Sequence, residues 1–294
     1  MERFEAAVRW GRVGAGLAAP GTPAEVWRRE LARLEKTRYG SAWINEGIGR
    51  SEVFSQLGLM LAATRRLVVG TGIANIWARQ APTMQAGAET LAGAHPGRLA
   101  LGLGVSARAA VEAAGLTYGR PLAEMTRYLD RMDAAEVTPG VPFPRLLAAL
   151  GPKMLELARE RADGAYPHTL PVENTALARA ALGPGKLLVV GVGMFLDDDI
   201  ERARAAARRS ALFTMPGSPY VTHLRRLGYA GDLEPEPSDR VVDAIFACGG
   251  GDAIAARVRE HLDAGADHVV LQPMDADLTT LVDHLEAVSE HLPA

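Results

Sequence analysis

The sequence predicts an α/β protein built as a (β/α)8 TIM barrel, in which a helix follows nearly every one of eight parallel strands. Three observations support this fold class. Short apolar segments alternate with amphipathic ones along the chain, the apolar segments are continuous runs, and several end in a glycine-bearing turn with a polar tip. Continuous apolar runs are typical of parallel strands that are covered on both faces. Folds of this kind bind ligands where their strands end.

Eight apolar segments are predicted as strands. The first four are residues 12–17, 41–46, 67–74 and 99–105. The last four are residues 145–150, 165–169, 186–195 and 268–274. The fifth segment, RLLAAL, fits a strand or a helix fragment by pattern alone, and the sixth is the weakest in apolar content.

Helices are predicted between these strands, because apolar side chains recur on one face and capping residues mark the starts. In the helix at 22–36, Thr22 is a good N-cap and Pro23 occupies the first helical position. Further helices are predicted at 54–64, 82–94, 121–135, 151–164, 197–212 and 278–291, and the GGGD sequence after Cys248 is expected to begin another. The connections after strands four and seven, residues 106–144 and 197–267, are long, which is typical of lids and substrate loops.

Composition narrows the class of protein further. Of 294 residues, 48% are hydrophobic and 23% charged, and the net charge of −3 provides no global attraction for nucleic acid or a membrane surface. The single cysteine, Cys248, excludes an intramolecular disulfide, and no histidine spacing suggests a metal site. No signal peptide or apolar span of about 20 residues is recognised. We therefore expect one cytoplasmic domain over residues 1–294, with neither a nucleic-acid partner nor a membrane partner.

Five segments together carry a family resemblance. In chain order they are GTGIANIWAR from Gly70, GRLALGLGVS from Gly97, YGRPLAEMTRYLD from Tyr118, LAALGPKMLELARERADGA from Leu147 and HVVLQPM from His268. The chain resembles the luciferase-like monooxygenase superfamily and, within it, the branch of probable F420-dependent oxidoreductases. Glycine-bearing strand ends are common one at a time, whereas five in register are specific.

The resemblance implies a barrel that binds F420 or FMN at the carboxyl ends of its strands, and a homodimer. It also implies a non-prolyl cis peptide bond at a bulge in strand three, for which Gly72–Ile73 is the matching position. The main hypothesis is an F420-dependent oxidoreductase that transfers a hydride to or from a small organic substrate of unassigned identity. An FMN-dependent monooxygenase or reductase is the nearest alternative, distinguished by the reaction of reduced flavin with oxygen. A third is a flavin- or deazaflavin-binding protein with little turnover.

The first candidate cofactor-binding residues lie at the ends of strands three and four. They are Thr71, Gly72, Ile73 and Asn75, followed by Gly104, Val105 and Ser106. Ile73 would support the ring, and Ser106 would donate a hydrogen bond to the cofactor. Asn75 either contacts ring or substrate or caps its turn. The glycines at 70, 72, 102 and 104 are expected to let the backbone approach a flat ligand closely.

A second candidate group is the helix start Gly151, Pro152, Lys153 and Met154. Free N–H groups and the positive end of the helix dipole make such a start an anion site, to which Lys153 adds a charge. F420 and FMN both carry a phosphate. The alternative is an ordinary helix start, with Gly-Pro as punctuation and Lys153 exposed to solvent.

Glu46 and His168 are the candidate catalytic residues. Glu46 matches the acidic residue that the family often carries at the end of strand two, but Gly47 replaces the histidine that commonly follows it. Ala107 likewise stands where relatives carry a histidine or a carboxylate. Glu46 either acts as acid or base, or accepts a salt bridge from Arg50 or Arg79. His168, in AYPHT, has an ordinary pKa near 6.5 that suits proton transfer, or it is structural.

Overall fold

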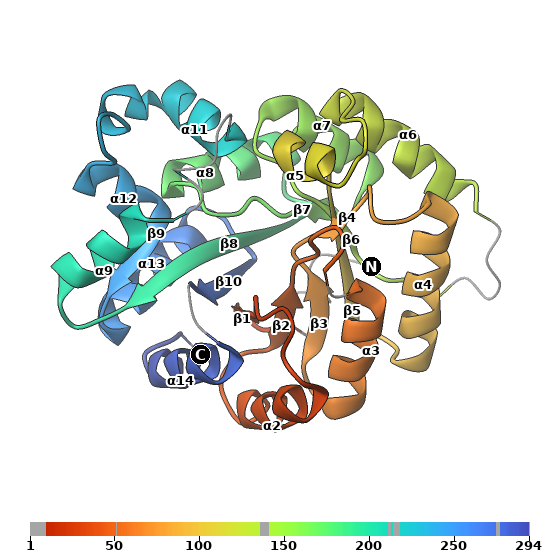
Figure 1. The fold of residues 1–294 in the computed structure, drawn as a ribbon, viewed down its shortest axis with the longest axis horizontal. Coiled ribbons are helices and arrows are strands. Elements are labelled where there is room, and N and C mark those ends of the chain that lie inside the picture. Colours follow the sequence, from red (N-terminus) through yellow and green to blue (C-terminus); the bar gives the residue numbers. More distant parts are fainter. Residues whose placement is uncertain are drawn as a thin grey trace.

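Eight parallel strands close into a barrel in the computed structural model, which describes residues 10–50, 52–135, 141–210, 213, 218–274 and 277–293 (Figure 1). Within these residues the barrel strands are β1 (Val13–Gly16), β2 (Ser41–Ile44), β3 (Val68–Thr71), β5 (Leu99–Gly104), β6 (Arg145–Leu147), β7 (Gly164–Ala165), β8 (Leu187–Leu196) and β10 (His268–Pro273). Consecutive members pair in parallel, and β10 pairs with both β8 and β1, which closes the ring. The predicted fold class is confirmed.

Helices cover the outside of this barrel (Figure 1). They are α2 (Ala24–Leu34), α3 (Val53–Ala63), α4 (Ala81–Ala94), α6 (Pro121–Asp133), α7 (Pro152–Arg161), α8 (Val172–Leu182), α13 (Gly251–Asp263) and α14 (Leu278–Ser289), with the short α5 (Arg108–Ala113) after β5. Proline occupies the first turn of α4, α6 and α7, where no intrahelical N–H is needed. Helix α8 was not predicted. None of the helices in the described residues is long and apolar enough to cross a membrane.

The long connection after β8 is a folded excursion on one side of the barrel (Figure 1). It comprises α9 (Ile200–Arg208), α11 (Pro219–Leu224), the turns η1 (Arg225–Tyr229) and η2 (Ala230–Asp232), α12 (Asp239–Ile245) and β9 (Phe246–Gly249), which pairs with the outer half of β8. Phe195, Val242 and Phe246 belong to its own apolar cluster. The predicted helix end at residues 211 and 212 lies outside the described residues, as do residues 1–9, on which the expected absence of a signal peptide rests.

The predicted strand at 67–74 is interrupted by a β-bulge. Gly70 pairs with Ala100 in β5, and pairing resumes in β4 (Ala74–Asn75), where Ala74 faces Leu103. The chain advances four residues from Gly70 to Ala74 but only three from Ala100 to Leu103 on β5, so the bulge contains one extra residue. The Gly72–Ile73 peptide bond within the bulge is cis, at the position that the resemblance indicated.

Aromatic rings fill the barrel interior, and strand glycines make room for them. Trp43 stacks on Tyr166 with ring centroids 5.4 Å apart, and a Cβ at Gly70 would lie 2.5 Å from the Trp43 ring. A Cβ at Gly104 would lie 2.5 Å from Ile73. At Gly70 and Gly104, which were expected to bring the backbone close to a ligand, the missing Cβ instead makes room for neighbouring side chains. A lumen of this size holds wide rings only where the facing strand lacks a Cβ.

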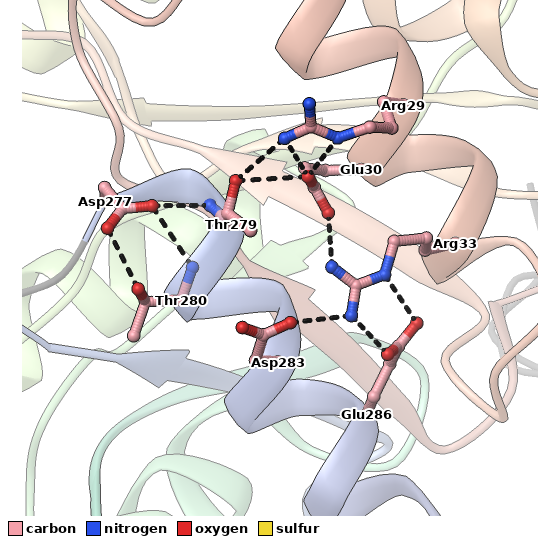
Figure 2. A network of polar contacts seen from close by, with 8 residues as sticks. All are labelled: Arg29, Glu30, Arg33, Asp277, Thr279, Thr280, Asp283 and Glu286. Atoms are coloured by element: carbon pink, nitrogen blue, oxygen red, sulfur yellow. Dashed lines mark hydrogen bonds and ion pairs between the residues drawn. The ribbon is translucent and has the colours of Figure 1, made fainter.

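A polar network joins the first and last covering helices, α2 and α14 (Figure 2). The carboxylate of Glu30 is fully buried and accepts hydrogen bonds from Arg29 and Arg33 at 2.7 Å each. Arg33 also binds Asp283 and Glu286 of α14. Burial by itself raises the pKa of Glu30, but the bonds from the two arginines outweigh burial and lower it. The network therefore secures the seam where the ring of helices closes.

Candidate functional site at the carboxyl ends of the strands

The bulge forms a fixed, partly exposed step at the mouth of the barrel. Gly72 and Ile73 are partly exposed, although Thr71 and Ala74 on either side are buried. The Gly72 N–H donates to the Ile44 carbonyl at 2.7 Å, and the Ile73 carbonyl accepts the Glu46 N–H at 2.9 Å. Ile73 packs on the aromatic interior beneath. An apolar side chain thus stands at the strand ends on a backbone held from both sides.

Thr71 lies below this step and is fully buried. Its hydroxyl donates to the Gly102 carbonyl at 2.7 Å and accepts the Gly102 N–H at 2.9 Å. The two bonds replace ladder pairing that the bulge removes. The structure therefore places Thr71 within the sheet, where it supports the bulge.

The Glu46 carboxylate is bonded to the chain just after the bulge. One carboxylate oxygen accepts the Asn75 N–H and an Arg79 N–H, each at 2.9 Å, and the other binds a second N–H of Arg79. Arg79 also binds Glu52 at the start of α3. Of the two interpretations of Glu46, the ion pair with Arg79 is observed, and a role in proton transfer stays a prediction. Asn75 uses its side-chain oxygen to accept the Trp77 N–H at 3.1 Å, which is the turn-capping alternative.

The end of β5 turns its carbonyls toward aromatic side chains. The Val105 carbonyl accepts the Trp77 indole N–H at 2.9 Å, and the Ser106 carbonyl accepts the Tyr118 hydroxyl at 3.1 Å. Ser106 has φ of +58°, a left-handed conformation that is uncommon outside glycine and asparagine. No hydrogen bond links the Ser106 hydroxyl to the described residues, so this hydroxyl remains available to a ligand.

The start of α7 combines an uncapped helix N-terminus with an exposed lysine. Gly151 is the N-cap, and no side chain of the described residues caps the helix. Apart from its chain neighbours, no atom of the described residues lies within 4 Å of a Cβ placed at Gly151. Pro152 and Lys153 are exposed, while Met154 is partly buried against the core. Pro152 has no N–H, and the Met154 N–H donates to the Gly151 carbonyl at 3.1 Å, so the Lys153 N–H and the Lys153 ammonium are what the first turn offers an anion.

His168 is held between two partners at the ends of β7, β8 and β10. Its Nε2 lies 3.1 Å from the Gln272 amide oxygen, and its Nδ1 lies 2.6 Å from the Thr169 hydroxyl. An amide oxygen only accepts, so Nε2 carries the proton and Nδ1 accepts from Thr169. Burial lowers the pKa of His168, although the bond to Gln272 opposes this. The imidazole is therefore neutral at pH 7.

Tyr166 and Gln272 lie beside His168, and sequence reasoning missed both as site residues. The Tyr166 hydroxyl would be 2.7 Å from a Cβ at Gly72 and 3.0 Å from one at Gly191, so it lies between β3 and β8 under the mouth. It makes no hydrogen bond to the described residues. Gln272 is partly exposed and lies over Gly16. Gln272 is a polar residue near the end of the apolar strand HVVLQPM, and this pattern could have indicated it as a site residue.

The described residues offer neither a cluster of metal ligands nor a reactive thiol. No group of three or more histidine, cysteine, aspartate or glutamate side chains among the described residues is arranged to hold a metal. Cys248 lies on β9 in the excursion, and burial raises its pKa to about 12. Its thiol is therefore protonated at neutral pH and packs as a small apolar group.

The chain is similar to several known proteins over most of its length. A 5,10-methylenetetrahydromethanopterin reductase from Methanolobus tindarius is 27% identical over 281 residues, covering 80% of this chain and 86% of the relative. An F420-dependent secondary alcohol dehydrogenase, solved with an F420–acetone adduct, superposes with a TM-score of 0.77 at 14% identity, covering 96% of this chain and 99% of that one. The oxygenating constituent of 3,6-diketocamphane monooxygenase from Pseudomonas putida, solved with FMN, superposes with a TM-score of 0.66 at 14% identity, with coverage of 96% and 99%.

The two structural likenesses show the shared fold. The model of the luciferase-like monooxygenase family matches residues 10–268, nearly the whole barrel. The protein therefore belongs to the luciferase-like monooxygenase family, as its five motifs indicated.

Proposed function

We propose that the protein is an F420-dependent oxidoreductase that transfers a hydride between the deazaflavin and a small organic substrate. The Gly72–Ile73 bulge carries this proposal, because it offers a flat ring a partly exposed apolar step above an aromatic floor. The similarity to an F420-dependent dehydrogenase favours F420 over FMN. When bound, F420 supplies the hydride-carrying carbon C5 of its ring.

The residues at the mouth fit such a cofactor. Ile73 would support one face of the ring, and the Ser106 hydroxyl is free to donate to it. The uncapped start of α7, with Lys153 beside it, would hold the phosphate. Orienting the ring and the substrate in a pocket that excludes water is the main contribution that the protein would make to catalysis.

His168 is the better of the two candidates for proton transfer. The Glu46 carboxylate is engaged by Arg79 and by backbone N–H groups, so it has no free lone pair directed at the mouth. His168 is neutral, and its basic Nδ1 accepts the Thr169 hydroxyl. A proton taken up at Nδ1 would come through that hydroxyl, and the Nε2–H bond to Gln272 would stay in place.

Fluorescence titration of the purified protein with F420, and separately with FMN, tests the proposal. We expect tight binding of F420 and weak binding of FMN. Lys153→Gln should weaken F420 binding about 2- to 5-fold, the effect of one exposed charge at a helix start. Lys36→Gln is the matched control, because Lys36 is exposed just after α2, at the amino-terminal side of the barrel.

Preference for FMN would replace the proposal with its alternative, an FMN-dependent monooxygenase or reductase, and oxygen consumption would then be the assay. The P. putida monooxygenase likeness favours that alternative. Tight F420 binding without turnover of any alcohol, ketone or imine in a substrate screen would favour the third hypothesis, a cofactor-binding protein. The missing histidine at Gly47 supports that third hypothesis.

A further inference from the structure

We propose that the Tyr166 hydroxyl and the Gln272 amide nitrogen form a two-donor seat that binds a carbonyl oxygen of the cofactor ring, and that His168 orients Gln272 within it. The proposal deepens the function proposed above and rests on it for the identity of the ligand. Its basis is a pair of donors at the mouth that no described residue satisfies.

Tyr166 supplies the first donor. Its side chain is 2% exposed and stacked on Trp43, so the ring cannot turn its hydroxyl out to bulk solvent. Burial, and secondly the neighbouring Tyr220, raise its pKa, so the phenol keeps its proton. The hydroxyl is not among the fully buried polar atoms that lack a partner, so it keeps some access to solvent, and a ligand acceptor could reach it.

Gln272 supplies the second donor, and His168 decides which way its amide points. His168 Nε2 lies 3.1 Å from the Gln272 amide oxygen, which can only accept, while His168 Nδ1 lies 2.6 Å from the Thr169 hydroxyl. The amide oxygen is thereby engaged, and the NH2 group is directed elsewhere. That nitrogen has no partner among the described residues, so it is available at the mouth.

Two glycines show that this arrangement is tightly built. A Cβ at Gly191 would lie 2.1 Å from the His168 ring, and a Cβ at Gly16 would lie 2.8 Å from Cβ of Gln272. Real Cβ atoms essentially never come within 3 Å of another heavy atom, so a residue other than glycine at either position would displace His168 or Gln272. Glycine at both positions therefore leaves the space that His168 and Gln272 occupy.

The position of the Tyr166 hydroxyl favours the ring over the rest of the ligand. The hydroxyl is next to Gly72, which belongs to the step on which the ring is proposed to lie. Neutral O–H and N–H donors match an uncharged acceptor, and the pyrimidine carbonyls of a deazaflavin or flavin ring are such acceptors. A phosphate would instead call for the cationic helix start at α7.

F420 affinity, measured by fluorescence, tests the seat. Tyr166→Phe removes only the hydroxyl and keeps the stack on Trp43, so we expect a 2- to 10-fold weaker Kd and an unchanged fold. Gln272→Glu keeps an acceptor for His168 but removes the donor, and should weaken binding at least as much. Tyr39→Phe is the matched control: Tyr39 donates to the Leu285 carbonyl at 3.0 Å, just before β2, so it should lower Tm and leave Kd unchanged.

A double-mutant cycle tests the orienting role of His168. If His168 acts through Gln272, then Gln272→Leu should weaken F420 binding in the wild type and have no further effect in a His168→Leu background. Conversely, additive effects would overturn that role. His168→Asn, which retains an N–H donor, should recover part of the affinity lost in His168→Leu.

The outcomes separate this inference from the proposed function. Wild-type protein that binds F420, together with a Tyr166→Phe variant of equal affinity, would refute the seat and leave the function standing. Wild-type protein that prefers FMN would revise the function, and the same variants would then be measured with FMN, whose ring has the same carbonyls. Binding of neither cofactor would overturn both.

Discussion

Acid should destabilise this protein through His268, which is buried inside the barrel. The ring is 1% exposed and packs edge-on against Trp10 with centroids 5.9 Å apart. Its Nδ1 donates to the Gly11 carbonyl at 3.0 Å, and its Nε2 accepts the Ser41 hydroxyl at 2.8 Å. Burial lowers the pKa of His268 to about 4. The neutral ring is thus fully hydrogen-bonded, and the attraction of the nearby Asp267 carboxylate offsets only part of the burial that disfavours the charged ring.

The sign of the effect follows from the two pKa values. The unfolded chain has an ordinary histidine pKa of about 6.5, so between pH 6.5 and pH 4 it binds a proton that the folded state does not. The stabilisation is complete above pH 6.5 and is lost as pH falls toward 4. Between pH 7 and pH 5 the loss from His268 alone is about 2 kcal/mol.

Urea unfolding at pH 7 and pH 5 measures this loss, with His268→Gln as the variant. Glutamine keeps a donor and an acceptor but does not titrate. The variant should be less stable than the wild type at pH 7, and its free energy of unfolding should fall by about 2 kcal/mol less on going to pH 5. An identical pH dependence in both proteins would refute the assignment. Burial also lowers the pKa of His261, to about 3. His261 is present in the wild type and in the variant, so its contribution cancels when their pH dependences are compared.

Three further predictions concern the support of the site and of the barrel. Thr71→Val should lower the free energy of unfolding by about 1–3 kcal/mol, because it leaves both backbone groups of Gly102 unpaired; a urea series in which stability is unchanged would contradict the bridging role. Gly70→Ala should cost about 1–3 kcal/mol, since the new Cβ would meet the Trp43 ring at 2.5 Å, and calorimetry should show a lower Tm; an unchanged Tm would mean that the interior has room to spare. Glu30→Gln should destabilise at pH 7 and matter less at pH 4, because the lowered pKa of Glu30 provides stability that is lost as pH falls through it; thermal melts at both pH values check the sign.

The sequence by itself determined the barrel, because the order of apolar runs and amphipathic segments is set by interactions over a few residues. It also indicated the bulge at Gly72–Ile73, through the family resemblance of its motifs. It missed α8, whose segment follows the weakest predicted strand and begins at a proline without a side-chain cap. It did not predict β9, since a four-residue strand that pairs only with the outer half of β8 has little pattern of its own.

Only the tertiary structure decided what the polar residues at the mouth contact. Glu46 meets Arg79 across 33 residues, and His168 meets Gln272 across 104, because closure of the barrel brings separate strand ends to one face. The strand glycines are the clearest case. From sequence Gly70, Gly72 and Gly104 predict room for a ligand, whereas in the folded chain they make room for Trp43, Tyr166 and Ile73, since the volume beside a Cα depends on side chains distant in sequence.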